Sequence, residues 1–98
     1  MIKLKDSIQA IKFTGSKKSE DLIVKALEDS NITFLGIRTN PIMKKASLMY
    51  ISHEYPMGIS EIVKGDYVLA SSENKLLAVL DEEYFITLFE EVKWYGLH

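Results

Sequence analysis

The chain of 98 residues contains no cysteine, two prolines and five glycines. Without cysteine it can form no disulfide, thiolate zinc site or cysteine nucleophile, and its first residues lack the apolar core of a signal peptide, so we expect a cytoplasmic protein. No apolar run approaches the roughly 20 residues that cross a bilayer, so we expect no contact with membranes. Because proline and glycine are too sparse for a linker, the length predicts a single domain over residues 1–98.

A strong charge of one sign is also missing. The 12 basic and 14 acidic side chains leave a net charge of −2, so nucleic acid is not an expected partner. The charge is uneven, because residues 1–49 carry nine basic and five acidic groups and residues 50–98 carry three and nine. Two halves of one domain can attract each other in this way. Self-association through complementary patches, or a basic patch for a small anion, are the alternatives.

The residues of the common catalytic motifs are too few or wrongly spaced. His53-Glu54 begins like a metalloprotease motif, but Met57 stands where the second histidine is needed. Ser52 precedes His53 directly, and neighbours along a strand point to opposite faces, so they cannot form a nucleophile–base pair by proximity. The dispersed glycines form no phosphate-binding fingerprint. We therefore expect a protein without enzymatic activity, metal or cofactor.

Hydrophobic periodicity predicts strands and helices over most of the chain. An apolar stripe at three- and four-residue spacing predicts a helix over residues 17–29, with Ser16 or Ser19 as its N-cap. Alternating apolar residues predict strands over 7–14, 32–37 and 46–52. Residues 59–63 fit either a short strand or a single helical turn.

The last third has the clearest pattern. A tight turn at residues 64–66 is followed by a predicted hairpin of strands 67–71 and 75–80. Residues 76–80 are apolar on both faces, which predicts a central strand covered on both sides. Asp81 is a candidate N-cap for a short helix over residues 84–89, and residues 90–94 are expected to form an edge strand.

These elements predict an α+β fold with one curved, mostly antiparallel sheet resembling a half-barrel. One main helix follows the first strand, and a short helix lies near the C-terminus. The residues expected at the centre of the core are Leu22, Leu27, Phe34, Leu77, Val79, Phe85 and Phe89.

Two groups of side chains are candidate binding residues. Arg38, Lys44 and Lys45 surround the connection near Pro41 and can bind a small anion by ion pairing, although a solvated basic loop has the same composition. Tyrosines are typical anchors of binding surfaces and equally typical of a core with a wet rim. The expected aromatic group around Pro56 and the turn at residues 64–66 consists of Tyr50, His53, Tyr55, Asp66 and Tyr67.

Two segments resemble small uncharacterised phage and prophage proteins. Residues 8–15 read Ile-Gln-Ala-Ile-Lys-Phe-Thr-Gly, like the first strand of those proteins, and residues 65–68 read Gly-Asp-Tyr-Val, like their turn before a C-terminal hairpin. The hairpin strand over residues 75–80 and the acidic-aromatic residues 84–92 extend the likeness, whereas residues 31–63 are not matched. Lys64 stands where the family often has proline. The resemblance implies a phage-encoded accessory protein in a bacterial cell and carries over no catalytic residues.

Three functions remain open on the sequence. The favoured hypothesis is a non-enzymatic phage accessory protein that binds a host protein, with a role in host takeover or anti-defence. The second is an oligomeric protein that binds or sequesters a small anionic ligand such as a nucleotide signal. The third is an enzyme of unknown reaction.

Overall fold

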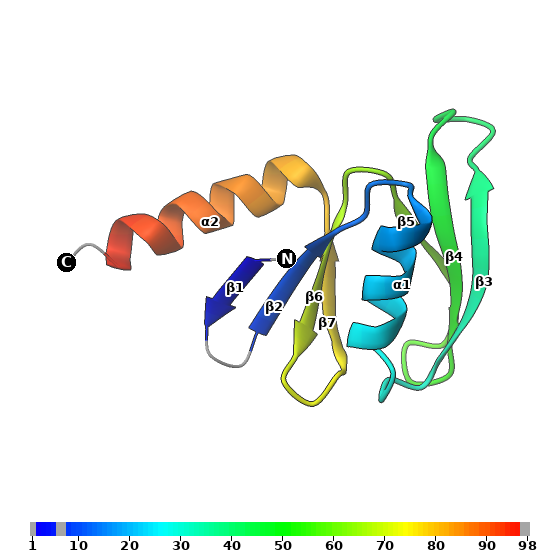
Figure 1. Ribbon diagram of the computed structural model, residues 1–98, viewed down its shortest axis with the longest axis horizontal. Coiled ribbons are helices and arrows are strands. Elements are labelled where there is room, and N and C mark those ends of the chain that lie inside the picture. Colours follow the sequence, from blue (N-terminus) through cyan, green and yellow to red (C-terminus); the bar gives the residue numbers. More distant parts are fainter. Residues whose placement is uncertain (1, 6–7, 97–98) are drawn as a thin grey trace.

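The chain forms an α+β structure of seven strands and two helices (Figure 1). The computed structural model describes residues 2–5 and 8–96, and the side chains of residues 8–89. The elements in chain order are β1 (Ile2–Lys5), β2 (Ile8–Lys12), α1 (Lys17–Ala26), β3 (Ile32–Thr39), β4 (Ala46–Ser52), β5 (Gly58–Val63), β6 (Tyr67–Ser71), β7 (Leu76–Leu80) and α2 (Glu82–Gly96).

The strands divide between two open antiparallel sheets, where the sequence predicted one curved sheet. The first sheet has the order β1-β2-β6-β7 and the second the order β3-β4-β5. β5 and β6 are joined by the short turn at residues 64–66, yet they pair with different neighbours: Leu48 of β4 lies opposite Ile62, and Ile11 of β2 lies opposite Val68. The turn therefore carries the chain from one sheet to the other.

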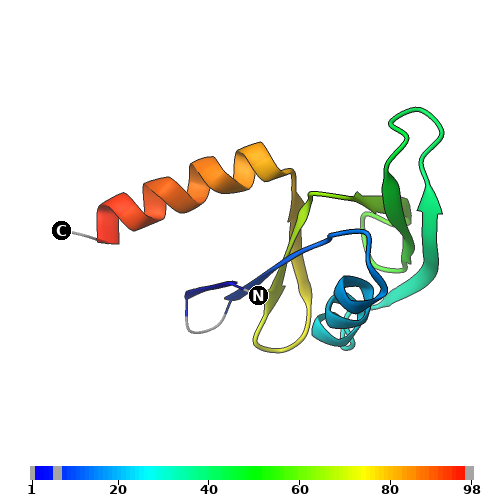
Figure 2. The same cartoon turned by 45° about the horizontal axis from the view of Figure 1, so that its top comes forward.

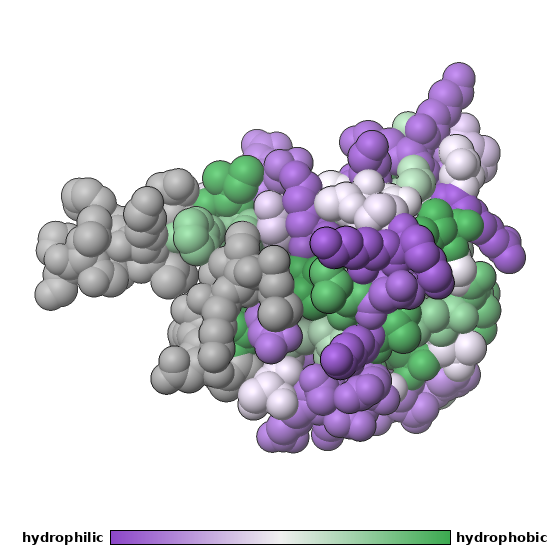
Figure 3. All heavy atoms as spheres, in the orientation of Figure 1, coloured by the Kyte–Doolittle hydropathy of each residue, from purple (hydrophilic) through white to green (hydrophobic). Residues whose placement is uncertain are grey.

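The helix α1 lies between the two sheets (Figures 1 and 2). Ser16 is its N-cap, because the Ser16 Oγ accepts a hydrogen bond from the Ser19 N–H at 3.1 Å. Glu20 in the first turn and Lys25 in the last turn suit the two ends of the helix dipole. Hydrophilic side chains dominate the face of the molecule that carries α1 (Figure 3).

The core lies where α1 meets the inner faces of both sheets. As expected, Leu27 and Phe85 are buried, and Phe34 and Val79 pack against the core while half-buried. Leu22 was expected inside but is 41% exposed, because Ile23 and Ala26 form the buried side of the helix. The residues of the buried cluster are Ile11, Phe13, Ile23, Ala26, Leu27, Leu48, Tyr50, Ile62, Val68 and Ala70.

The prediction that residues 76–80 form a central strand is wrong. β7 pairs with β6 on one side and ends the four-stranded sheet on the other. Leu77, also expected in the core, is 51% exposed, so the face of β7 that carries it is not fully covered. An apolar run signals burial on both faces but does not say whether a second strand pairs with it.

The C-terminal segment is one helix of 15 residues and not a short helix followed by a strand. The expected cap is present, because the Asp81 Oδ1 accepts a hydrogen bond from the Tyr84 N–H at 2.7 Å. Glutamate and lysine in residues 90–93 are strong helix formers, and they extend α2 where the sequence predicted an edge strand. α2 leads away from the two sheets (Figures 1 and 2).

Two further differences concern the strands. β1, over residues that the sequence analysis left without structure, pairs with β2 at the edge of the first sheet, so the main helix follows the second strand and not the first. Residues 59–63 belong to the strand β5, which decides between the two alternatives left open above.

Candidate functional site

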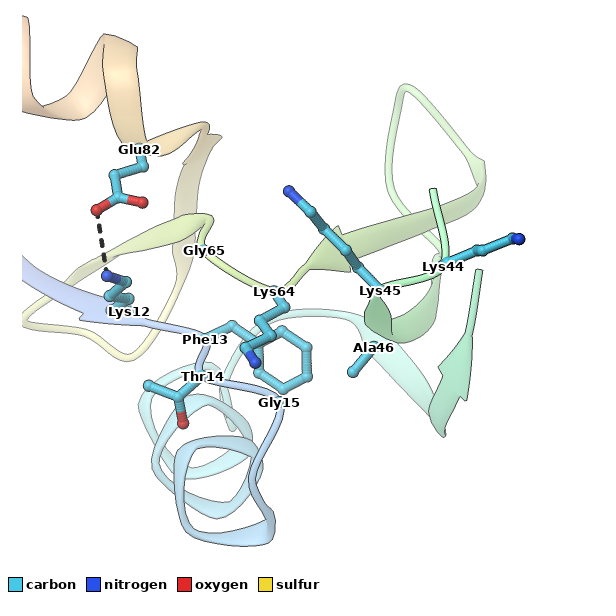
Figure 4. Close-up of a pocket in the computed structure, with 10 residues that line it drawn as sticks. All are labelled: Lys12, Phe13, Thr14, Gly15, Lys44, Lys45, Ala46, Lys64, Gly65 and Glu82. Carbon is cyan, nitrogen blue, oxygen red and sulfur yellow. Dashed lines mark hydrogen bonds and ion pairs between the residues drawn. The ribbon is translucent and has the colours of Figure 1, made fainter. Parts of the chain in front are cut away.

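A cleft of about 540 Å³ opens where three connections between elements meet (Figure 4). We call it the lysine cleft. Its walls are the β2–α1 connection, the end of the β3–β4 loop, the β5–β6 turn and the first turn of α2. The lining residues are Lys12, Phe13, Thr14, Gly15, Lys44, Lys45, Ala46, Lys64, Gly65 and Glu82.

Backbone hydrogen bonds join the segments that form the cleft. The Gly65 N–H donates to the Phe13 carbonyl at 2.8 Å, and the Phe13 N–H donates to the Asp66 carbonyl at 2.9 Å. The Lys64 N–H donates to the Ala46 carbonyl, also at 2.8 Å. These bonds use main-chain groups alone, so they hold the three segments together without involving the lysine side chains.

Gly15 permits the close approach of two of these segments. Its φ of +80° lies in the left-handed region that favours glycine, and a Cβ atom placed there would meet the Ala46 Cβ at 3.2 Å. The β2–α1 connection can therefore turn tightly against the start of β4. This turn brings Thr14 and Gly15 to the cleft wall.

Asn40 shapes the loop that carries two of the lysines. Its Oδ1 accepts hydrogen bonds from the Ile42 N–H at 2.9 Å and the Met43 N–H at 3.0 Å. Its backbone N–H donates to the Lys45 carbonyl, and its carbonyl accepts from the Lys44 N–H, both at 2.8 Å. Asparagine thus closes the loop and fixes where residues 44 and 45 leave it.

Positive charge predominates in the cleft, which has four lysines and one glutamate. Lys12 Nζ pairs with Glu82 Oε1 at 3.2 Å, and both side chains are about half exposed. Among residues 8–89, Lys45 and Lys64 form no ion pair with an acidic side chain. The Lys44 ammonium points away from those of Lys45 and Lys64 (Figure 4), so Lys44 contributes mainly its stem to the wall.

Asp66 follows Gly65, a lining residue of the cleft, in the turn that joins β5 to β6. Its Oδ2 accepts a hydrogen bond from the Val63 N–H at 3.0 Å, which closes the turn. Partial burial raises the pKa of this carboxyl above its ordinary value, with further raising by Asp81 and Glu61, against the lowering effects of the Val63 hydrogen bond and the Lys45 charge. The role of Asp66 in this geometry is to hold the turn.

The structure divides the predicted basic group. Lys44 and Lys45 line the lysine cleft, but Arg38 does not. Arg38 lies opposite Ser47 in the β3–β4 pairing and is exposed. An anion in the cleft would therefore meet Lys45 without Arg38.

The predicted aromatic group is divided as well. Tyr67 stacks on Phe85 of α2, with ring centroids 3.9 Å apart. Tyr50 belongs to the core, while His53 is exposed and its Nε2 lies 2.8 Å from the Thr33 Oγ1. Tyr55 is 95% exposed. Tyr67 therefore belongs to the first sheet and the other three to the second sheet and its β4–β5 loop.

Tyr50 and Tyr55 border a second cavity of about 550 Å³, which we call the β7 groove. It runs between β7 and the part of the second sheet nearest to the β4–β5 loop. Its lining residues are Asp29, Ser30, Asn31, Ile32, Tyr50, Ser52, Glu54, Tyr55, Pro56, Lys75, Leu76, Leu77, Ala78 and Val79.

Sequence reasoning missed Lys12, Lys64 and Glu82, which complete the lysine cleft. They lie far apart in the chain, and only the pairing of β2 with β6 and of β4 with β5 brings them together. The sequence pattern that could have identified the two lysines is their position, since Lys12 and Lys64 each stand at the end of a strand and shortly before a glycine.

In the described part of the chain, no group of three His, Asp or Glu side chains is placed to hold a metal ion. The helices described there are too short or too polar to cross a bilayer. Comparison with protein-family models, with curated protein sequences and with solved structures finds no match to this chain.

Proposed function

We propose that this protein binds a small phosphate-bearing ligand, such as a nucleotide, in the lysine cleft. The observation that carries the proposal is that Lys12, Lys45 and Lys64 line one cavity in which Glu82 is the single acidic lining residue. Ammonium groups are compact, flexible cations and common phosphate ligands in proteins. The volume of about 540 Å³ lies within the range of small-molecule sites, about 300–1,000 Å³.

The proposed binding needs no catalytic step. The lysines bind the phosphate oxygens by charge-assisted hydrogen bonds. Glu82 is a competitor, because its carboxylate already pairs with Lys12. A bound phosphate would take its place on that lysine.

The resemblance of both ends of the chain to phage proteins supports a biological setting for this binding. We propose a phage-encoded accessory protein in the cytoplasm of a bacterial host, which sequesters a nucleotide signal and so acts against host defence. The uneven charge of the two halves of the chain supports self-association as part of this role.

Thermal unfolding in the presence of inorganic phosphate, pyrophosphate, ATP and uncharged adenosine tests the proposal. A ligand at a hundredfold excess over its Kd stabilises the native state by about 2.7 kcal/mol, so pyrophosphate or ATP should raise the Tm and adenosine should not. Lys45→Gln or Lys64→Gln should weaken binding about tenfold or more, since each charged hydrogen bond contributes about 1.5–3 kcal/mol.

Lys25→Gln is the matched control, because Lys25 is exposed in the last turn of α1 and does not line the cleft. It should leave the ligand-induced rise in Tm unchanged. No rise with any phosphate compound, or equal loss of binding in Lys25→Gln and Lys64→Gln, would reject the proposed site.

A second candidate function, binding of a host protein, is favoured by the apolar β4–β5 hairpin. Tyr55, Met57 and Ile59 are 95%, 74% and 67% exposed, and large apolar side chains gathered on one exposed hairpin are typical of protein contacts. A host protein captured from infected cells should be lost with the double variant Met57→Ser, Ile59→Ser. It should be retained with Ile42→Ser, a control at a side chain that is 89% exposed on another loop. Capture of no protein above background would remove this candidate.

A further inference from the structure

The strand β7 combines a central-strand sequence with an edge position. Leu76 to Leu80 are five apolar residues without charge or proline, yet β7 ends the four-stranded sheet. Exposed edge strands usually carry lysine, proline or a bulge that prevents pairing with other chains. The register irregularity in its pairing with β6 falls at Leu77, so Ala78 to Leu80 pair regularly with β6, and Lys75 lies before the strand. An edge of this composition is suited to a further strand.

The outer edge of β7 leaves backbone groups available. The Leu76 N–H donates to the Ser30 Oγ at 2.7 Å, and this bond closes the start of the strand. From Leu77 onward, no hydrogen bond except the pairing with β6 is made by the strand backbone within the described residues. In an antiparallel ladder alternate residues direct their N–H and C=O groups outward, so this stretch presents donors and acceptors to an incoming strand.

The β7 groove lies along this edge. Four consecutive β7 residues, Leu76 to Val79, line it. Since successive strand residues point to opposite faces, a cavity that touches all four lies beside the backbone and not over one face. The opposite wall is formed by Ile32 of β3 and by Tyr50 and Ser52 of β4.

We infer that the β7 groove binds one extended peptide segment of a partner protein by strand addition to β7. The peptide backbone would pair with residues Leu77 to Leu80, and apolar side chains would face Ile32 and Tyr50. This inference rests on protein binding, the second candidate function, and is independent of the lysine cleft.

Charge on the groove rim specifies the peptide further. Asp29 and Glu54 line the groove together with one basic side chain, Lys75, which leaves an excess of negative charge. A peptide with an apolar centre and lysine or arginine at its ends complements this rim. The expected partner segment is therefore basic at its ends and β-branched in the middle.

The wall opposite β7 favours a single peptide strand over a second copy of this chain as the occupant of the groove. Neighbouring strands of a sheet lie about 4.8 Å apart, so the β7 of another copy would bring its own β6 immediately behind it. That second strand would meet the wall formed by Ile32, Tyr50 and Ser52. A lone peptide avoids this overlap.

The test uses a synthetic peptide of alternating valine and threonine with a lysine at each end. On titration with this peptide, the backbone amide signals of Leu77 to Val79 should shift in NMR spectra, and the hydrogen exchange of those amides that point away from β6 should slow. The same peptide with N-methyl groups on alternate backbone nitrogens cannot pair along one edge, so its affinity should fall at least tenfold.

A variant of the protein distinguishes binding in the groove from nonspecific binding of the peptide. Leu77→Lys places a charge on the edge and should weaken peptide binding at least tenfold, whereas Ile42→Lys, at a side chain that is 89% exposed on the β3–β4 loop and outside the groove lining, should not. Circular dichroism of both variants checks that they fold. Equal binding of the N-methylated peptide, or no slowing of exchange at the amides of this stretch that point away from β6, would overturn the inference.

Two other results are informative. Protection, in the absence of peptide, of the amides in this stretch that point away from β6, together with a dimer in light scattering, would make a second copy the occupant and overturn the inference. Failure of peptide binding while Met57→Ser, Ile59→Ser still abolishes capture of a host protein would reject the groove alone and leave the second candidate function standing.

Discussion

At the residue scale, a few positions are constrained by the backbone, whereas the lysines of the cleft are not. Gly15 has a positive φ and a close neighbour, since its substituted Cβ would lie 3.2 Å from the Ala46 Cβ. Gly36 has a φ of +98°, but a Cβ there would meet nothing within 4 Å. A comparison of the two positions therefore distinguishes the cost of backbone strain from the cost of a steric clash.

We expect Gly15→Ala to lower the free energy of unfolding more than Gly36→Ala does. Each alanine is placed in a left-handed conformation, which costs about 1–2 kcal/mol, and the contact with Ala46 adds to this cost at position 15 alone. Urea denaturation of the two variants measures the difference. Equal destabilisation of the two variants would mean that the β2–α1 connection can move away from Ala46 without a cost in stability.

At the element scale, α2 is attached to the sheets by aromatic stacking. The Phe85 ring lies 3.9 Å from the Tyr67 ring at an interplanar angle of 11°, and the Phe89 ring lies 6.0 Å from that of Phe85. The Lys12 ammonium lies 5.8 Å from the Tyr67 centroid, and its partner Glu82 belongs to α2. The attachment of the helix thus adjoins the lysine cleft.

Phe85→Ala should destabilise the protein by about 3–5 kcal/mol, because Phe85 is 3% exposed and its removal ends the stack on Tyr67. The neighbouring Ile86→Ala is the control, since Ile86 is 46% exposed and should cost much less. Urea denaturation followed by circular dichroism measures both changes. If the two variants lost equal stability, α2 would not be held through Phe85.

Local signals explain which elements the sequence predicts well. The β4 boundaries, the turn at residues 64–66, the hairpin of β6 and β7 and the Asp81 cap depend on near neighbours, and all are present. The position of β7 in the sheet and the length of α2 depend on what lies beside them in space. The sequence predicts a strand over residues 90–94, because hydrophobic periodicity does not distinguish a short strand from a helix over so few residues.

The candidate site shows the same division. Lys44 and Lys45 were identified as basic residues near Pro41, a purely local signal. Lys12 and Lys64 join them only through strand register, which one sequence does not specify. Arg38 carries the same charge but lies outside the cleft lining. It belongs to β3, and only the end of the loop that follows this strand reaches the cleft.

At the scale of the whole molecule, the two sheets share one core. Ile11 and Val68 from the first sheet, Ile23 from α1, and Leu48 and Ile62 from the second sheet belong to the same buried cluster. The longest dimension is 43 Å, and α2, whose 15 residues span about 22 Å, accounts for much of it. Neither sheet has a core of its own.

We therefore expect one cooperative unfolding transition. Native-state hydrogen exchange should give the slowest amides of β4 and of β6 the same free energy of opening, because each sheet loses its covered face when the other unfolds. Urea denaturation followed by circular dichroism should yield that same value. Two separate transitions, or a large difference between β4 and β6, would show that the sheets are independent folding units.

The main-chain hydrogen bonds between the segments of the lysine cleft affect which of its residues can change in evolution without loss of the fold. The segments that form the cleft are joined by amide and carbonyl groups that every residue except proline provides, and the Lys45 and Lys64 side chains take no part in these bonds. If the cleft binds phosphate as proposed, mutations at Lys45 or Lys64 would change which ligand it prefers, while these main-chain bonds persist.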